Sequence, residues 1–129
     1  MWVEKMATVL IVDDIDGVRR SLKKVVMLEG HDVLEAEDGE QAIRLLKENL
    51  PDLLITDIYM PGMDGLELIG KLRSDYPDLK IIAISGGQPG EGEDEIANVL
   101  SQAVKFGADK GLAKPYSLDE MQKAIREFI

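Results

Sequence analysis

Short apolar runs alternate with longer amphipathic segments along this chain, and the alternation limits its possible folds more than any other feature. A short run of mostly apolar residues is typical of a buried strand. The segments between the runs place apolar side chains at the spacing of one helix face, as Val18, Leu22 and Val26 do. We predict strands at residues 9–12, 32–36, 53–56, 79–84 and 108–113, each followed by a helix. This order favours an α/β fold, with a parallel sheet covered by helices on both faces.

Local signals mark the ends of several of these helices. Pro51 prevents a helix over residues 41–49 from continuing, because proline lacks a backbone N–H and clashes with the preceding turn. Asp64 is predicted to cap the third helix, and Ser117 with Glu120 has the pattern of a capping box at the start of the fifth. Right-handed crossovers then leave a few doubly wound topologies, in which ligands bind at the carboxyl ends of the strands.

The composition limits the number of domains and the kinds of partner. With 129 residues we expect one domain over 1–129, with an N-terminal extension of about residues 1–7 and no output domain. The formal net charge of −10 repels nucleic acid and anionic membranes, so neither is an expected partner, whereas a divalent cation is. Cysteine is absent and His31 is the single histidine, which excludes disulfides and multi-histidine metal sites. Since no segment resembles a signal peptide or membrane span, we expect a cytoplasmic protein.

Chemically reactive polar side chains stand at the ends of the first, third, fourth and fifth predicted strands. They are, in strand order, Asp13 and Asp14, Asp57, Ser85, and Lys114. The carboxyl ends of parallel strands lie at one edge of a sheet, so we expect these side chains to lie close together. Three adjacent carboxylates repel one another unless a cation is bound, and Mg²⁺ suits them because it prefers oxygen ligands. A carboxylate beside Mg²⁺ and a lysine can act as a nucleophile toward a phosphoryl group, giving an aspartyl phosphate.

Four segments around these residues resemble the receiver domain of the two-component response regulators. They are IVDD at 11–14, TDIYMPGMDG at 56–65, ISGG at 84–87 and AKPY at 113–116. The resemblance extends from about Val9 to the C-terminus. It implies a flavodoxin-like, doubly wound (βα)5 fold, in which a five-stranded parallel sheet of order 2-1-3-4-5 has helices on both faces.

The resemblance also implies a role for each residue that matches a family motif. Asp57 matches the phosphoacceptor. Asp13, Asp14 and Asp57, with the backbone carbonyl of Tyr59, match the ligands of Mg²⁺, or of Mn²⁺ in its place. Among these, Asp14 is the more direct ligand and Asp13 acts partly through water.

Two further positions match groups that contact the phosphoryl group in the family. Ser85 matches the switch hydroxyl and Lys114 the family's invariant lysine. The bond between Lys114 and Pro115 is expected to be cis, which is feasible for an X–Pro pair.

The chain departs from the family pattern at two places. Gly111 stands where relatives usually carry an aromatic residue whose rotamer reports phosphorylation, and the span from Ser85 to Gly107 is longer than in most receivers. We therefore expect phosphorylation to reorder residues 86–95 and the start of the following helix, without an aromatic flip.

The implied function is that of a phosphoacceptor signalling module, and not of an enzyme, since it performs only Mg²⁺-dependent self-phosphorylation and autodephosphorylation. The phosphoryl group would come from a sensor histidine kinase or a histidine phosphotransfer protein. Output would occur by contact between a downstream protein and the face formed by the fourth helix, fifth strand and fifth helix, or by relay of the phosphoryl group. We expect a monomer or weak dimer.

Two other functions compete with this interpretation. The DIDGV segment at 14–18 resembles the opening motif of haloacid dehalogenase-type phosphohydrolases, but that assignment leaves Asp57 without a role. A flavodoxin-like electron carrier would need a phosphate-binding, Ser/Thr-rich loop after the first strand, where this chain has an acidic pair that repels a flavin phosphate.

Overall fold

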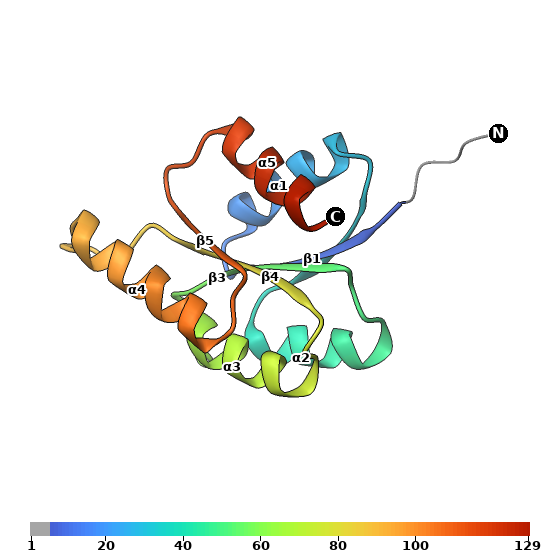
Figure 1. The fold of residues 1–129 in the computed structure, drawn as a ribbon, viewed down its shortest axis with the longest axis horizontal. Coiled ribbons are helices and arrows are strands. Elements are labelled where there is room, and N and C mark those ends of the chain that lie inside the picture. Colours follow the sequence, from blue (N-terminus) through green and yellow to red (C-terminus); the bar gives the residue numbers. More distant parts are fainter. Residues whose placement is uncertain (1–5) are drawn as a thin grey trace.

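The computed structural model describes residues 6–129 and contains one five-stranded parallel sheet between two layers of helices (Figure 1). The strands are β1 (Thr8–Val12), β2 (Asp32–Ala36), β3 (Leu53–Asp57), β4 (Lys80–Ser85) and β5 (Lys110–Ala113). The helices are α1 (Asp16–Leu28), α2 (Gly39–Glu48), α3 (Gly65–Asp75), α4 (Glu93–Phe106) and α5 (Leu118–Phe128). The strand order is β2-β1-β3-β4-β5, which confirms the predicted doubly wound topology.

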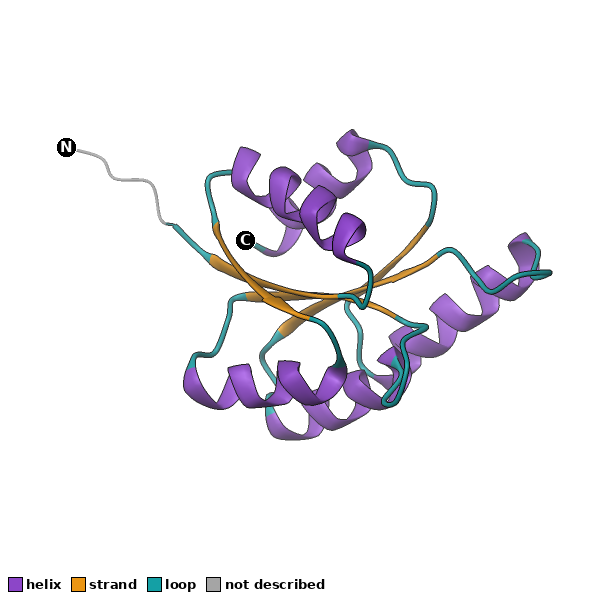
Figure 2. Ribbon diagram, turned by 180° about the vertical axis from the view of Figure 1, so that it is seen from behind, coloured by secondary structure: helices purple, strands orange, loops and turns teal. Residues whose placement is uncertain are grey.

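The helices divide between the two faces of the sheet. α1 and α5 cover one face, and α2, α3 and α4 cover the other (Figures 1 and 2). Successive strand residues point to opposite faces, so Leu10 and Leu54 join the core beneath α2, α3 and α4, while Ile11 and Ile55 join the core beneath α1 and α5. All four side chains are fully buried, because a central parallel strand is covered on both sides.

The strand boundaries differ slightly from the predicted ones, and two of the differences concern the chemistry of the site. β3 and β4 each extend by one residue beyond their apolar runs, so Asp57 and Ser85 are the last paired residues of their strands. β5 begins at Lys110 and is shorter than predicted. Asp57 and Ser85 are thus held by the sheet itself, whereas Asp13, Asp14 and Lys114 directly follow the last residues of β1 and β5.

The predicted helix caps are present. Asp64 Oδ1 accepts a hydrogen bond from the N–H of Glu67 at 2.8 Å, and Ser117 Oγ accepts one from Glu120 at 3.0 Å. Leu118 fits the apolar spacing of Met121 and Ile125 in α5, but it is 52% exposed. The buried residues of α5 are Met121, Ala124 and Ile125, so the buried stripe begins one turn after the start of the helix.

Asp109 is part of a hydrogen-bond network before β5. Its Oδ2 accepts hydrogen bonds from the N–H of Ile81 at 2.8 Å and from the Arg73 guanidinium at 3.1 Å. Arg73 also donates to the carbonyl of Gly107 at 2.6 Å and to that of Leu79 at 2.8 Å. This network joins the end of α3 to the segments that enter β4 and β5. It lies at the edge of the sheet where these strands begin, opposite the edge formed by their carboxyl ends.

Residues 1–5 of the expected N-terminal extension lie outside the described residues. Ala7 is buried, and its N–H donates to Nδ1 of His31 at 3.2 Å. His31 therefore has a structural partner at the start of β2. Within residues 6–129, no helix combines the length and the apolar character needed to cross a membrane.

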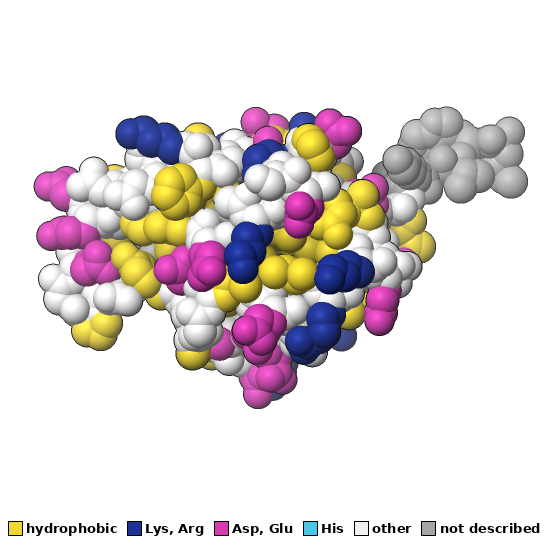
Figure 3. All heavy atoms as spheres, turned by 90° about the horizontal axis from the view of Figure 1, so that it is seen from below, with side chains coloured by type: hydrophobic (Ala, Val, Ile, Leu, Met, Phe, Trp, Pro, Cys, Tyr) yellow, Lys and Arg dark blue, Asp and Glu magenta, His cyan; other side chains and the backbone are white. Residues whose placement is uncertain are grey.

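The layer of α2, α3 and α4 is seen from below in Figure 3, where apolar side chains lie among charged side chains of both signs. A shallow groove between α2 and α3 contributes to this face and is lined by Ile43, Lys47, Lys71 and Tyr76. α4 extends beyond the edge of the sheet in both ribbon views, and only Val99 and Ala103 of this helix are buried.

Candidate metal-binding site at the carboxyl edge of the sheet

The sheet brings the ends of β1, β3, β4 and β5 to one edge. The register pairs Val12 with Thr56, Asp57 with Ile84, and Ser85 with Ala113. Each of these pairs lies at or next to the last residue of its strand, so the polar residues that follow the strands emerge together. This arrangement brings together the polar residues that the sequence placed at the strand ends.

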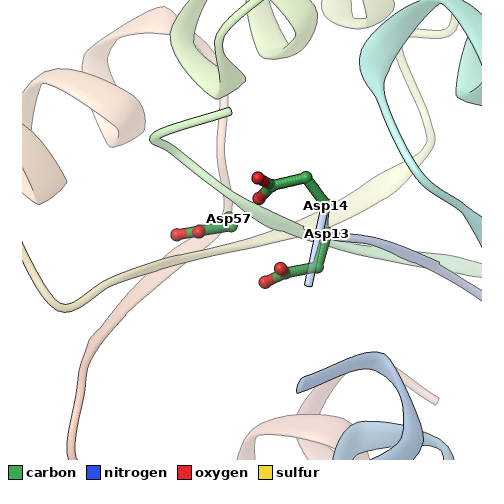
Figure 4. A group of neighbouring side chains, drawn as sticks. All are labelled: Asp13, Asp14 and Asp57. Atoms are coloured by element: carbon green, nitrogen blue, oxygen red, sulfur yellow. The ribbon is translucent and has the colours of Figure 1, made fainter. Parts of the chain in front are cut away.

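Three carboxylates from two strand ends converge at this edge (Figure 4). Asp13, Asp14 and Asp57 each offer an oxygen, and these oxygens lie within 4.8 Å of one another. Asp13 and Asp57 are buried, whereas Asp14 is exposed. The cluster therefore has a protein-enclosed side and a side open to solvent.

Backbone N–H groups fix one oxygen of each buried carboxylate. The N–H of Ile58 donates to Asp57 Oδ1 at 2.9 Å, and the N–H of Ile15 donates to Asp13 Oδ1 at 2.9 Å. The second oxygen of each group faces Lys114, whose Nζ lies 3.8 Å from both Asp57 Oδ2 and Asp13 Oδ2. One ammonium thus serves two carboxylates, at distances too long for direct hydrogen bonds.

Lys114 is itself held by the end of β4. Its N–H donates to the carbonyl of Ser85 at 2.9 Å, and its peptide bond to Pro115 is cis. Ser85 is fully buried, and its Oγ accepts a hydrogen bond from the N–H of Gly87 at 3.1 Å. The hydroxyl and the ammonium therefore belong to one hydrogen-bonded pair of strand ends.

Gly87 connects Ser85 to α4. It has a positive φ of 78°, and a Cβ at this position would come within 2.8 Å of Cγ1 of Ile96. The loop after β4 therefore packs directly on the first turns of α4. The predicted reordering of residues 86–95 on phosphorylation stays a prediction, and this contact is the route by which it would reach the helix.

Tyr59 lies two residues after Asp57, in the loop between β3 and α3. Its hydroxyl donates to Glu91 Oε2 at 3.4 Å, and Oε1 of Glu91 accepts from the N–H of Gln88 at 2.7 Å. Burial and the neighbouring Glu91 carboxylate raise the pKa of Tyr59, which keeps its phenol protonated as the donor. The side chain thus links the loops that follow β3 and β4.

Gly65 allows the first turn of α3 to pack on the end of β3. Its N–H donates to the carbonyl of Ile58 at 2.7 Å, and a Cβ at this position would overlap the carbonyl oxygen of Asp57 and come within 2.6 Å of Cα of Ile58. A side chain here would have to displace the backbone that carries Asp57. Glycine is therefore required by close approach at this position.

We expect Gly65→Ala to lower the free energy of unfolding by about 1–3 kcal/mol, the usual cost of overpacking. Gly70→Ala in the same helix is the matched control, because a Cβ there would meet no atom within 4 Å. It should stabilise α3 by about 0.5–1 kcal/mol, since alanine favours a helix over glycine. Urea unfolding measures both, and equal effects would contradict the assignment.

The electrostatics of the cluster favour protonation of its buried acids. Burial is the main cause that raises the pKa of Asp57 from 3.8 to about 6; Asp13 and Asp14 add to it, while Lys114 and the N–H of Ile58 oppose it. Burial likewise raises the pKa of Asp13. The fixed groups of the protein therefore leave the negative charge of the site under-compensated.

This donor set fits a divalent cation. The ligand groups are oxygen atoms, two of the carboxylates are buried, and one lysine cannot balance three negative charges. The exposed side at Asp14 leaves room for the waters that a hard cation retains. The cluster of Asp13, Asp14 and Asp57 thus indicates divalent metal binding.

Arg19 and Tyr116 border this site and have no role in the sequence interpretation. Arg19 is buried in α1, and its Nη1 donates to the carbonyl of Asp13 at 2.6 Å. Burial, and then the charges of Asp13 and Asp57, raise the pKa of Tyr116, which follows the Lys114–Pro115 pair. An arginine three residues before Leu22, in the apolar stripe of α1, was the sequence signal that could have identified Arg19.

Gly111 is a close-packing glycine. The pairing of β5 with β4 is continuous through it, so there is no bulge. A Cβ at Gly111 would lie 3.2 Å from both Cβ and Cδ2 of Leu100 in α4. Leu100 therefore occupies the space above β5 next to the position where the family usually has an aromatic residue.

The phosphohydrolase interpretation does not agree with the geometry. It needs the second acid of the DIDGV segment beside the first, but the side chain of Asp16 is 77% exposed and hydrogen-bonds with Arg19. The acid that joins Asp13 and Asp14 is Asp57, which that interpretation leaves unused.

Comparisons with known proteins identify the family. The family model of the response regulator receiver domain matches residues 9–126. The chain is 34% identical over 121 residues to the response regulator MprA of Mycobacterium sp. (strain KMS), covering 94% of this chain and 50% of that protein. It is 36% identical over 125 residues to the sensor kinase CckA of Brucella abortus (strain 2308), covering 95% of this chain and 12% of that protein. The chain thus spans half or less of the length of these relatives.

Solved structures give the same result. The response regulator TrrA from Thermotoga maritima, in complex with Mg²⁺–BeF, is 31% identical, with a TM-score of 0.81 and coverage of 96% of this chain and 100% of that one. The chemotaxis protein CheY4 from Vibrio cholerae is 26% identical, with a TM-score of 0.81 and coverage of 97% and 100%. With its strand order and its acidic cluster, the chain belongs to the response regulator receiver domains, the phosphoacceptor signalling modules of two-component systems.

Proposed function

We propose that Asp57 accepts a phosphoryl group from a phosphohistidine of a sensor histidine kinase or a histidine phosphotransfer protein. The observation that carries this assignment is the environment of its carboxylate. Oδ1 is held by the N–H of Ile58, and Oδ2 lies beside Lys114, while the carboxylate belongs to the acidic cluster. Oδ2 is thus left without a hydrogen bond from the backbone and acts as the nucleophile.

The transfer forms one bond and breaks one. Oδ2 of Asp57 attacks phosphorus, the P–O bond forms, and the P–N bond to the imidazole of the donor breaks. The electron pair of the P–N bond returns to the imidazole, which takes up a proton, and the product is an acyl phosphate on Asp57. Hydrolysis by water later returns the free carboxylate and inorganic phosphate, so the module has no turnover on other substrates.

Mg²⁺, or Mn²⁺ in its place, would be held by Asp13, Asp14, Asp57 and the backbone carbonyl of Tyr59. When bound, the cation supplies positive charge that offsets the charge on the phosphoryl oxygens. The exposed carboxylate of Asp14 is the more direct ligand. The buried Asp13, with Oδ1 tied to the N–H of Ile15, acts partly through water.

Lys114 and Ser85 act on the phosphoryl group itself. The Lys114 ammonium, at 3.8 Å from Asp57 Oδ2, is placed to pair with a phosphoryl oxygen. The Ser85 hydroxyl, which accepts a hydrogen bond from the N–H of Gly87, would give up that bond and donate a hydrogen bond to a second phosphoryl oxygen. That exchange would release Gly87, which packs on Ile96 of α4.

Output is proposed to occur by protein–protein contact at the face of α4, β5 and α5, or by relay of the phosphoryl group. Exposed apolar side chains on α4 and α5, namely Val104, Phe106 and Leu118, support this surface. The net charge of −10 argues against nucleic acid and anionic membranes as direct partners of this domain. The proposed setting is the cytoplasm, with the domain as a monomer or weak dimer.

The test of this function is an intact-mass measurement with a small phosphodonor such as acetyl phosphate. We expect a gain of one phosphoryl group per chain that requires Mg²⁺ and is lost again on standing. A chain that turns over small phosphate esters without stable labelling would contradict the proposal.

Asp14→Ala is expected to weaken Mg²⁺ binding by at least about tenfold, because it removes an anionic ligand from the cluster. Asp64→Ala is the matched control, since it also removes one exposed carboxylate near the site, but Asp64 is the N-cap of α3. The loss there should appear as about 1 kcal/mol of stability and not as lost affinity. A metal titration followed by NMR distinguishes the two, and equal losses of affinity would argue against the site.

A further inference from the structure

We propose that Arg19 is a positioning residue that fixes the peptide between Asp13 and Asp14 and thereby sets the geometry of the cation site. This inference rests on the proposed function, since it concerns the same cation site. It starts from the position of Arg19 in the buried stripe of α1, where the next members are Leu22 and Val26. An apolar residue would continue that stripe, yet the chain places a buried guanidinium there.

The location is also unfavourable for a cation. Arg19 is the fourth residue of α1, near a helix N-terminus, where the aligned peptide dipoles favour negative charge. A buried charge is retained only when specific partners compensate it. The contacts of Arg19 therefore indicate what the residue is for.

One of these contacts reaches the site. Nη1 of Arg19 donates to the carbonyl oxygen of Asp13 at 2.6 Å. This carbonyl belongs to the peptide that joins Asp13 to Asp14, so its orientation sets the direction in which both side chains leave the backbone. Asp13 is fixed further by its N–H, which donates to Ala36 at 3.1 Å, and by its carboxylate, which accepts from Ile15.

Asp14 has a less enclosed position. Its carboxylate is exposed, and its place in the cluster depends on the backbone that carries it. The contact between the Arg19 guanidinium and the Asp13 carbonyl is thus the support for the ligand on the open side of the site. A ligand held through its neighbour in this way loses affinity when the neighbour is removed, typically 10- to 100-fold for outer-sphere partners of metal ligands.

Two acids orient the guanidinium. Asp16, one turn earlier on α1, accepts a hydrogen bond from Nη2, and Glu35 of β2 lies 3.6 Å from Nε. Glu35 also forms an ion pair with Lys23, whose Nζ lies 3.6 Å from Glu35 Oε2. With Nη2 and Nε held on these acids, Nη1 is directed at the Asp13 carbonyl, and the planar, multi-donor guanidinium makes all three contacts at once.

The test depends on the sign of the effect. Arg19→Met removes a positive charge from beside a cation site, so simple electrostatics predicts that Mg²⁺ binds more tightly. Loss of positioning predicts the opposite. We expect Arg19→Met to bind Mg²⁺ at least tenfold more weakly than the wild-type chain in an NMR titration. Arg20→Met is the matched control, because Arg20 is the exposed neighbour on the same helix and its loss changes the net charge equally; its affinity should equal or exceed that of the wild type.

A second readout needs no metal. The carbonyl ¹³C shift of Asp13 in the cation-free protein should move in Arg19→Met and stay in place in Arg20→Met, because it reports the hydrogen bond to that oxygen. Arg19→Lys keeps the charge but cannot make the three contacts together, so we expect an affinity between those of the wild type and Arg19→Met, at least threefold below the wild type. If Arg19→Met does not fold, Arg19→Lys decides the question in the same titration.

Wild-type Mg²⁺ affinity in Arg19→Met, or in Arg19→Lys where only that variant folds, would overturn the role of Arg19 and leave the proposed function standing. An equal loss in Arg20→Met would overturn it as well, because the loss would then not depend on the contact between Arg19 and the Asp13 carbonyl. A wild-type chain that binds no Mg²⁺ would overturn the proposed function and this inference together.

Discussion

Asp57→Asn is expected to abolish the Mg²⁺-dependent transfer of a phosphoryl group from a small phosphodonor. The amide that replaces the carboxylate is uncharged and is not a nucleophile toward phosphorus at neutral pH. The neighbouring acids are unsuited to replace it, since Asp13 is buried with Oδ1 held by the N–H of Ile15, and Asp14 lies on the exposed side of the cluster. We therefore expect labelling to fall to background in intact-mass spectra.

Asp64→Asn is the control for that experiment. It makes the same chemical change in the loop after β3, and asparagine can still cap α3. It should be labelled as fully as the wild-type chain. Undiminished labelling of Asp57→Asn would assign the phosphoryl group to another residue and contradict the proposed function.

The same substitution is expected to stabilise the cation-free protein by about 3 kcal/mol at pH 7.5. The pKa of Asp57 rises from 3.8 to about 6 in the folded chain, chiefly through burial. Each tenfold change in proton affinity corresponds to about 1.36 kcal/mol, which sets the order of magnitude of the effect. Asparagine resembles the protonated carboxyl in having no charge, so it avoids the cost of an ionised group in this site.

The sign of the pH dependence follows from the raised pKa. Below pH 3.8 Asp57 is protonated in both the folded and the unfolded chain, and its titration has no effect on stability. As the pH rises, the unfolded chain ionises first, so the wild type loses stability until the folded pKa of about 6 is passed. The advantage of Asp57→Asn should therefore be full at pH 7.5 and fall to about half at pH 5.

Urea unfolding in the presence of a chelator measures this difference at the two pH values. Asp32→Asn is the control, because Asp32 is an exposed carboxylate at the start of β2 and its loss changes the net charge equally. Its effect should stay within about 0.5 kcal/mol at both pH values. A stabilisation by Asp57→Asn that does not depend on pH would show that Asp57 ionises as freely in the folded chain as in the unfolded one.

The fold was predictable because its strands are buried on both faces. The sequence is almost continuously apolar in Val9–Val12 and in the run that ends at Asp57, a pattern that few structures other than a buried strand require. The helices between the strands have clear apolar periodicity and capping residues. The candidate site was predictable for a related reason. In a parallel sheet the strand ends share one edge, so a polar residue directly after an apolar run is placed by the fold itself.

The remaining features depend on contacts between elements that no local pattern encodes. Arg19 reaches the Asp13 carbonyl from a position that helix periodicity assigns to the core. Gly65 is required by the approach of α3 to the end of β3, and Asp109 by partners in β4 and α3. Leu118 fits the apolar spacing of α5, but it lies in the first turn of the helix, beyond the part that covers the sheet.

The most direct test of the central claim is the position of the phosphoryl group in the wild-type chain. Borohydride reduces an acyl phosphate to an alcohol, so a phosphorylated aspartate becomes homoserine, which peptide mass spectrometry locates. The account predicts homoserine at position 57 in the chain treated with acetyl phosphate and Mg²⁺, and unmodified aspartate at positions 13 and 14. Homoserine at 13 or 14, or none at 57 in a chain that has gained the phosphoryl mass, would contradict it.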